Sequence, residues 1–223
     1  MSMTRLMTAA TIGAAGLLLT GCGSAAPGVA VQVGDEVLTV RDIDATTSHY
    51  CTAVGEQFES TVPMSFVRQY VVQLLTLRSQ AEQLADDYGV TAGSTYQNDV
   101  AQRQGTARTL PEDVRADYIR LTSAPSYAQD VVDQIGKVVL DDQGVTDPTT
   151  EQVTQAGLDV FNQWPDANGI DVDPRYGLAS VDGVLKPVDT NTSVAVGDTA
   201  KLGLSETPDP GFADTLPSTH RCG

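Results

Sequence analysis

The feature that most constrains the fold is a long amphipathic segment between Pro63 and Gly89. Proline is favoured in the first turn of a helix and glycine just beyond its end, so these two residues bracket one helix. Its apolar residues recur at intervals of three and four, which predicts one wide buried face rather than a docking surface. The predicted buried residues are Val67, Tyr70, Val71, Leu74, Leu75, Leu77, Ala81, Leu84, Ala85 and Tyr88, with Arg68, Gln69, Gln73, Arg78 and Gln80 on the other side.

The segments around this helix predict a mainly helical domain. The short strands 30–33 and 36–38 flank the turn Gly34-Asp35, which indicates a small hairpin. Thr39 then has the position of an N-cap, with Asp42 completing a capping box for a helix that ends near Gly55. Further helices are expected over about 95–104, 111–122 (capped by Thr109), 125–139 and 148–164, the last ending before Pro165.

The sequence changes in character after Pro165. Residues 170–173 alternate like a strand, and residues 178–223 are rich in Gly, Pro, Ser, Thr and Asp, with one β-like patch at 193–196. We expect the tail to be loose from about Ser205. The predicted fold class is therefore mainly α, with a small β-hairpin at the start and a short β or irregular C-terminal extension.

The first residues predict an exported protein. Arg5 is the only charge before an apolar run, Met7–Leu19, that suits a signal peptide and falls short of the roughly 20 residues of a membrane span. The residues Leu19-Thr20-Gly21-Cys22 resemble the processing site of bacterial lipoproteins, in which Cys22 would carry diacylglycerol. An ordinary signal peptide is the alternative. The expected organisation is a signal peptide at 1–21, a tether at 22–29, a helical domain at 30–165 and an extension at 166–223.

The formal net charge of −16 restricts the partners. It argues against nucleic acid, because the phosphates would be repelled, and against a grip on anionic lipid heads. Attachment to the cell membrane, on its extracytoplasmic side, would then depend on the lipid on Cys22.

Two further cysteines remain, Cys51 and Cys222. Outside the cytoplasm they are each other's obvious partner, provided that the fold brings their Cα atoms within about 7 Å. The alternative is a pair of free thiols. His49 and His220 each lie two residues before one of these cysteines, but residues two apart on a helix point in different directions, so we expect no metal site. No cofactor is expected.

Catalytic patterns are sparse. With two histidines the chain offers few general bases, and it contains no nucleophile elbow, phosphate-binding loop or dinucleotide loop, so we do not expect an enzyme. The turn Pro174-Arg175-Tyr176-Gly177 leaves two interpretations. Either Tyr176 packs and Arg175 pairs with Asp171 or Asp173, or Arg175 and Tyr176 together face a ligand.

Residues 33–44 (VGDEVLTVRDID) and 81–91 (AEQLADDYGVT) resemble the N-terminal module of SurA-type periplasmic chaperones and related trigger-factor-like foldases. Residues 173–177 and 192–196 are similar to a group of actinobacterial lipoproteins that carry this module. The resemblance covers about 30–165 and implies a helical module that binds unfolded clients. The parvulin-type insert of that family is not present between the helices, so prolyl isomerase activity is not implied.

Taken together, the sequence predicts a non-catalytic, membrane-anchored binder of unfolded exported polypeptides, with an apolar groove between its helices. The alternative is a scaffold lipoprotein of an envelope complex, which would bind one specific partner. A prolyl isomerase is a third hypothesis.

Overall fold

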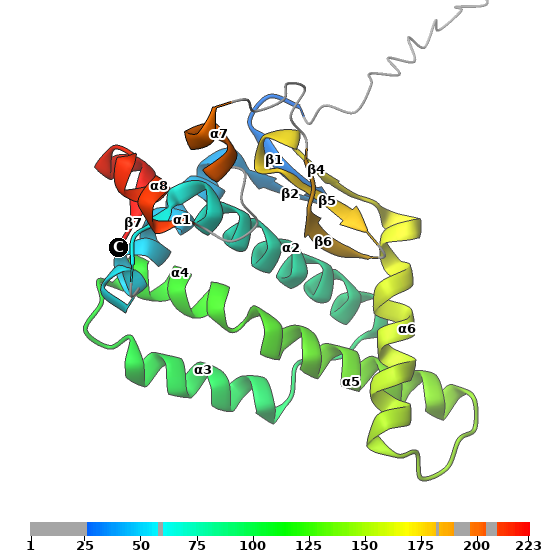
Figure 1. Cartoon of the computed structure of the whole chain (residues 1–223). Coiled ribbons are helices and arrows are strands. Elements are labelled where there is room, and N and C mark those ends of the chain that lie inside the picture. The colour runs from blue at the N-terminus through cyan, green and yellow to red at the C-terminus, as the bar shows by residue number, and fades with distance from the viewer. Residues whose placement is uncertain (1–25, 58–59, 182, 190–196, 204–208) are drawn as a thin grey trace, which may run out of the picture.

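The computed structural model describes residues 26–57, 60–181, 183–189, 197–203 and 209–223 (Figure 1). The predicted signal peptide, Cys22 and the β-like patch at 193–196 lie outside these residues. Within them the chain is mainly helical, with an antiparallel hairpin near its start and a few short strands toward its C-terminus, which confirms the predicted fold class.

The central element is helix α2 (Met64–Tyr88), which begins after Pro63 and ends at Gly89, as predicted. Gly89 adopts a left-handed conformation. Its buried side chains, among them Val71, Leu75 and Leu84, belong to the main core. On this face α2 packs against α1 (Val40–Val54) and α5 (Ala124–Asp142). The remaining long helices are α3 (Ser94–Thr106), α4 (Glu112–Thr122) and α6 (Thr150–Asn168).

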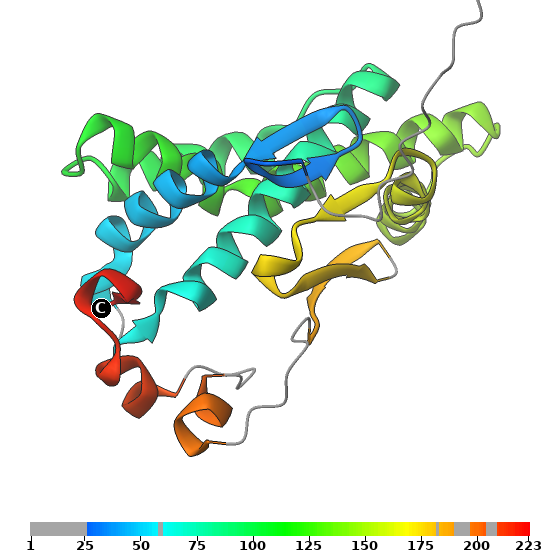
Figure 2. The same cartoon turned by 90° about the horizontal axis from the view of Figure 1, so that it is seen from above.

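The opposite face of α2 is covered by β structure (Figures 1 and 2). Strands β1 (Val29–Val33), β2 (Glu36–Thr39) and β4 (Ile170–Val172) form an antiparallel sheet with β1 in the middle. A second hairpin consists of β5 (Leu178–Val181) and β6 (Val184–Pro187). Two glutamines on α2 bind this layer. Gln69 Nε2 donates at 2.8 Å to the carbonyl of Tyr176, in the 3₁₀ turn (Pro174–Tyr176) before β5, and Gln73 Nε2 donates at 3.0 Å to the carbonyl of Leu185 on β6.

The prediction that a helix ends before Pro165 is wrong, because α6 continues through Pro165 to Asn168. Proline has no N–H to donate to the carbonyl four residues earlier, that of Phe161. The Gln80 side chain supplies the missing donor, with its Nε2 2.7 Å from the Phe161 oxygen. Gln80 is accordingly only 2% exposed, although the amphipathic pattern placed it on the polar side of its helix.

The other helix boundaries follow local signals with two exceptions. Thr39 and Asp42 form the predicted capping box, and Gly55 ends α1. Thr109 does not cap α4, which begins after Pro111. Helix α6 begins at Thr150, where Thr149 and Gln152 form a second capping box, rather than at Asp147-Pro148.

Helices α5 and α6 cross at very close range through two glycines. A Cβ atom on Gly136 would lie 1.9 Å from the Val153 carbonyl oxygen, and one on Gly157 would lie 2.0 Å from that of Val132. Both contacts are far shorter than van der Waals distance, so the crossing depends on the absence of side chains here.

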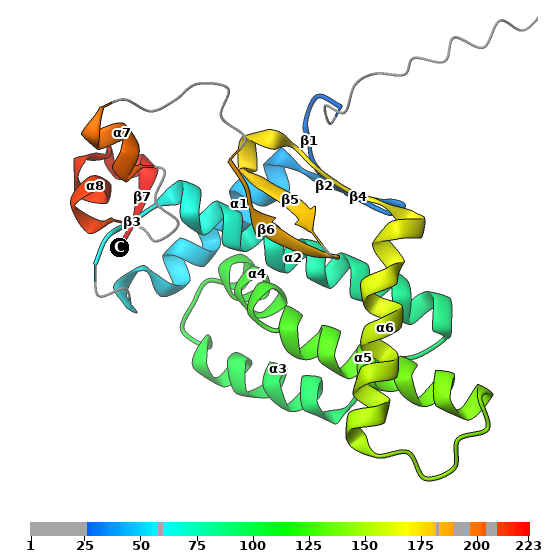
Figure 3. The ribbon, with the colours of Figure 1, turned by 45° about the vertical axis from the view of Figure 1, so that its right-hand side comes forward.

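The described part of the tail is folded, in contrast to the predicted looseness. Residues 209–223 form α8 (Pro210–Thr215), a 3₁₀ turn (Ser218–His220) and strand β7 (Arg221–Cys222), and α7 (Asp198–Leu202) precedes them. Strand β7 pairs with β3 (Val62–Pro63), directly before α2. The chain end thus lies beside the end of α1 and the start of α2 (Figure 3). Nonlocal pairing, which composition does not reveal, orders this segment.

Candidate functional site

The candidate site is a pocket of about 500 Å³ between the helices. Its size falls within the range of small-ligand sites in proteins. Five helices and the 3₁₀ turn that follows α1 (Gly55–Gln57) contribute to its wall. The lining residues are Tyr50, Val54, Gln57, Tyr70, Arg103, Tyr118, Thr122 and Pro125.

Two tyrosine rings form one side of the pocket. The ring centroids of Tyr50 on α1 and Tyr70 on α2 lie 5.4 Å apart at a tilt of 43°. Burial, together with the neighbouring phenols of Tyr70 and Tyr118, raises the pKa of Tyr50 to about 12, although the charge of Arg103 acts in the opposite direction. The Tyr50 hydroxyl is therefore protonated at neutral pH and able to donate a hydrogen bond.

The aromatic surface continues from the pocket toward solvent. Tyr70 is 37% exposed, and Phe66, one helical turn earlier on α2, is 41% exposed. Residues four apart lie next to each other on a helix surface, so the two rings form one accessible patch. Exposed aromatic side chains next to a pocket are typical of binding surfaces.

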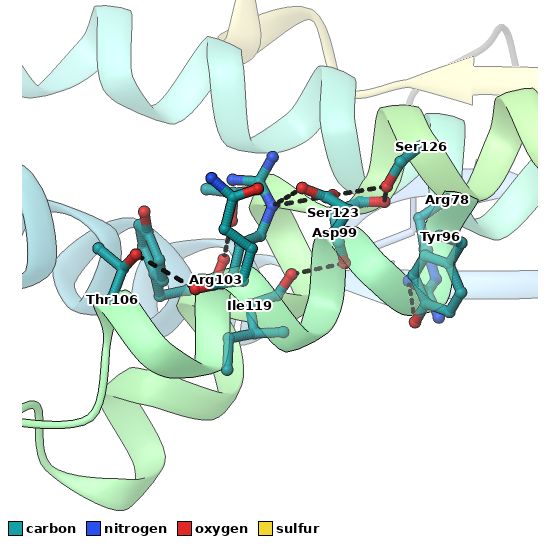
Figure 4. A network of polar contacts seen from close by, with 11 residues as sticks. Arg78, Tyr96, Asp99, Arg103, Thr106, Ile119, Ser123 and Ser126 are labelled. Atoms are coloured by element: carbon teal, nitrogen blue, oxygen red, sulfur yellow. Dashed lines mark hydrogen bonds and ion pairs between the residues drawn. The ribbon is translucent and has the colours of Figure 1, made fainter. Parts of the chain in front are cut away.

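Arg103 brings a positive charge to the wall and is held in place by Asp99 (Figure 4). Both carboxylate oxygens of Asp99 lie 2.9 Å from Arg103 Nε, and the hydroxyl of Ser126 donates to the same carboxylate at 2.6 Å. Burial alone would raise the pKa of Asp99, but the hydrogen bonds from Arg103 and Ser126 outweigh it and lower this pKa. Asp99 is therefore ionised at neutral pH and orients the guanidinium.

A second arginine fixes helix α3, which carries Arg103. The guanidinium carbon of Arg78 lies 4.0 Å from the centroid of the Tyr127 ring and 5.3 Å from that of Tyr96, and its Nη1 donates to the Tyr96 hydroxyl at 3.2 Å (Figure 4). The Tyr96 backbone N–H also donates to Asp130 at 2.8 Å. Cation–π and charged contacts thus bind α3 to α2 and α5.

His49 links α1 to α4, two of the helices that line the pocket. Its Nδ1 lies 2.6 Å from an oxygen of Asp117 on α4, and its Nε2 lies 3.8 Å from an oxygen of Asp113. This contact holds α1 and α4 together next to Tyr50 and Tyr118.

Cys51 and Cys222 form a disulfide with Cα atoms 5.7 Å apart, so the geometric condition set from the sequence is met. The bond fastens the C-terminal segment to α1, next to Tyr50. Among the residues that the structure describes, no cluster of three or more His, Cys, Asp or Glu side chains is arranged to hold a metal ion.

The structure does not bring Arg175 and Tyr176 together toward a ligand. Arg175 Nε binds the Asp173 carboxylate at 2.8 Å, which was one of the two sequence interpretations. Tyr176 is buried in the main core, with a hydroxyl that has no hydrogen-bond partner among the described residues. The pocket residues were not recognised as a site from the sequence, because they come from five helices and Tyr70 had been assigned to the buried face of α2.

Comparison of the chain with protein-family models, curated proteins and solved structures finds no match. Within the described part of the chain, no helix is both long enough and apolar enough to cross a membrane.

Proposed function

We propose that this protein is a non-catalytic, extracytoplasmic lipoprotein that binds unfolded segments of exported polypeptides. The observation that carries the proposal is the tyrosine-lined pocket with the exposed Phe66 and Tyr70 beside it. Tyrosine buries a large apolar area and still offers a hydroxyl, so such a surface accepts varied side chains.

The size of the pocket narrows the mode of binding. A volume of about 500 Å³ accommodates one or two side chains rather than a long apolar segment. A client would therefore be anchored at single aromatic residues along an extended chain, while the acidic surface keeps the complex soluble. The resemblance of residues 33–44 and 81–91 to SurA-type chaperones supports the same proposal.

Anchoring through Cys22 is part of the proposal and has its own test. Replacement Cys22→Ala should release the protein from the membrane fraction. Retention of the unprocessed variant in that fraction would refute lipid anchoring but would leave the proposal for the pocket untouched.

Suppression of aggregation tests the binding of unfolded chains. Residues 23–223 should reduce light scattering by a chemically unfolded test protein at near-stoichiometric ratios. Tyr70→Ala should weaken this effect, because it removes one wall of the pocket. Tyr88→Ala is the matched control, since Tyr88 lies on the same helix, is also 37% exposed and does not line the pocket. An absence of suppression at large excess would refute client binding.

One observation favours a scaffold as the second candidate function. Val181 and Val184 are cross-strand neighbours at the end of the β5–β6 hairpin, and both are exposed. An apolar pair at a hairpin tip suits a dedicated protein contact. Isolation of the lipidated protein with one stoichiometric partner, lost on Val184→Asp, would support the scaffold over the chaperone.

A further inference from the structure

We propose that the pocket recognises a carboxylate attached to an aromatic body, with Arg103 binding the carboxylate and Tyr50 and Tyr70 packing against the ring. This inference rests on the proposed function for the identity of the site, and it adds the chemical class of the ligand.

The charge of the pocket is the first argument. Among the lining residues that the structure describes, Arg103 is the only one with a formal charge, and this charge is positive. A guanidinium on the wall, with no carboxylate among the described lining residues, favours an anionic group at this point over a cationic one, although the net charge of the chain opposes anions elsewhere.

The geometry of the ion pair is the second argument. Asp99 engages Arg103 through Nε, and within the described part of the chain no hydrogen bond occupies Nη1 or Nη2. A guanidinium presents its donors as a planar fork that matches the two oxygens of a carboxylate. Asp99 and Ser126 therefore fix the arginine without using the terminal nitrogens that a ligand would bind.

The walls supply the remaining selectivity. The tilted rings of Tyr50 and Tyr70, together with Val54 and Pro125, offer an apolar surface on which a flat side chain packs. Tyr50 and Arg103 both line the pocket, so a ligand bound there can contact the phenol ring and the guanidinium together.

Two sources carry this chemistry: a free aromatic acid and the end of a peptide chain. Isothermal titration of residues 23–223 would compare N-acetylphenylalanine with its amide, and a short peptide ending in phenylalanine with its C-terminally amidated form. The acid should bind at least about tenfold more tightly than the amide, since a charge-assisted contact is lost in the amide. If N-acetylphenylalanine and the peptide acid both bind, the site accepts free aromatic acids as well as chain ends. If only the peptide acid binds, the site is specific for chain ends.

Three variants make the comparison specific. Arg103→Gln should bring the acid-to-amide ratio close to one, whereas Arg120→Gln, an equal change of charge at an exposed position on α4, should leave it unchanged. Tyr70→Ala should weaken acid and amide alike and preserve the ratio, which separates loss of the wall from loss of the charge. Circular dichroism would verify that each variant is folded.

Equal binding of acid and amide to the unaltered protein would overturn the inference, and this comparison requires no variant. If the peptide acid and the peptide amide bind equally, the proposal that the protein binds polypeptides stands, and only the recognition of a carboxylate is refuted. Tight binding of the acids without suppression of aggregation would support the carboxylate inference and refute the binding of unfolded polypeptides.

Discussion

Gln80 shows how one residue can determine the course of a distant helix. Its buried amide donates to the Phe161 carbonyl, which Pro165 leaves without its usual partner. Local sequence rules predicted that a helix ends before Pro165 and that Gln80 lies on the surface. Both predictions were wrong because neither takes account of the hydrogen bond between Gln80 and the Phe161 carbonyl. Neither residue alone carries the information, since the bond joins positions 81 residues apart.

The pairing of Gln80 with Pro165 predicts a non-additive double substitution. Gln80→Met keeps the length of the side chain but leaves a buried carbonyl unsatisfied, which should lower the free energy of unfolding by about 1–3 kcal/mol. In a Pro165→Ala background the cost should be smaller, because the new residue brings its own backbone N–H. Urea unfolding of the four proteins in this cycle measures the difference, and strict additivity would contradict the assignment.

The pKa of Tyr50 predicts a loss of stability at alkaline pH. Its value rises from 10.0 to about 12 on folding, so the unfolded chain releases this proton at lower pH than the native protein does. The contribution to stability is fully present below pH 10 and is lost as the pH rises toward 12. Urea unfolding at increasing pH should show a steeper decline for the unaltered protein than for Tyr50→Phe. Parallel declines would disprove the shift.

At the scale of elements, short-range signals were the most reliable. The capping box of Thr39 and Asp42, and Gly89 after α2, depend on residues within one turn, and both were predicted. The amphipathic pattern also placed Val71 and Leu84 in the core. It failed for Gln69 and Gln73, because a β layer contributed by distant residues covers the side of α2 that was assigned to solvent.

The crossing of α5 and α6 predicts opposite effects for two similar substitutions. Gly136→Ala should lower the free energy of unfolding by at least about 2 kcal/mol, because its Cβ has no room beside the Val153 carbonyl. Gly105→Ala, on α3 and in open space, should be neutral or stabilising by up to about 1 kcal/mol. Chemical denaturation of both variants measures the two free energies of unfolding. Similar changes in these free energies would argue against the close crossing.

At the scale of the whole molecule, the C-terminal segment closes the fold on itself. The disulfide joins Cys51 to a residue 171 positions later, and β7 pairs with the strand that leads into α2. The sequence indicated the cysteine pair but not the folded tail, and it gave no sign of the pocket. Sites of this kind depend on the relative placement of several helices, which local patterns do not encode.

Removal of the disulfide should loosen the tail first. Cross-links that close long loops contribute up to about 5 kcal/mol in chain-entropy terms, so Cys51→Ser with Cys222→Ser should lower stability by roughly 2–5 kcal/mol. Hydrogen exchange should accelerate in residues 209–223, while the α5–α6 crossing keeps its protection. Two free thiols in the denatured, unreduced protein would show instead that the bond does not form.

Site-specific photo-crosslinking in cells tests the central claim most directly. A photoreactive amino acid at position 70 faces the pocket, and the same group at position 88 lies on the same helix away from it. Our account predicts adducts with several exported proteins from position 70 and few from position 88. No adducts from position 70, or the same adducts from both positions, would contradict it, and one dominant adduct would identify a scaffold rather than a chaperone.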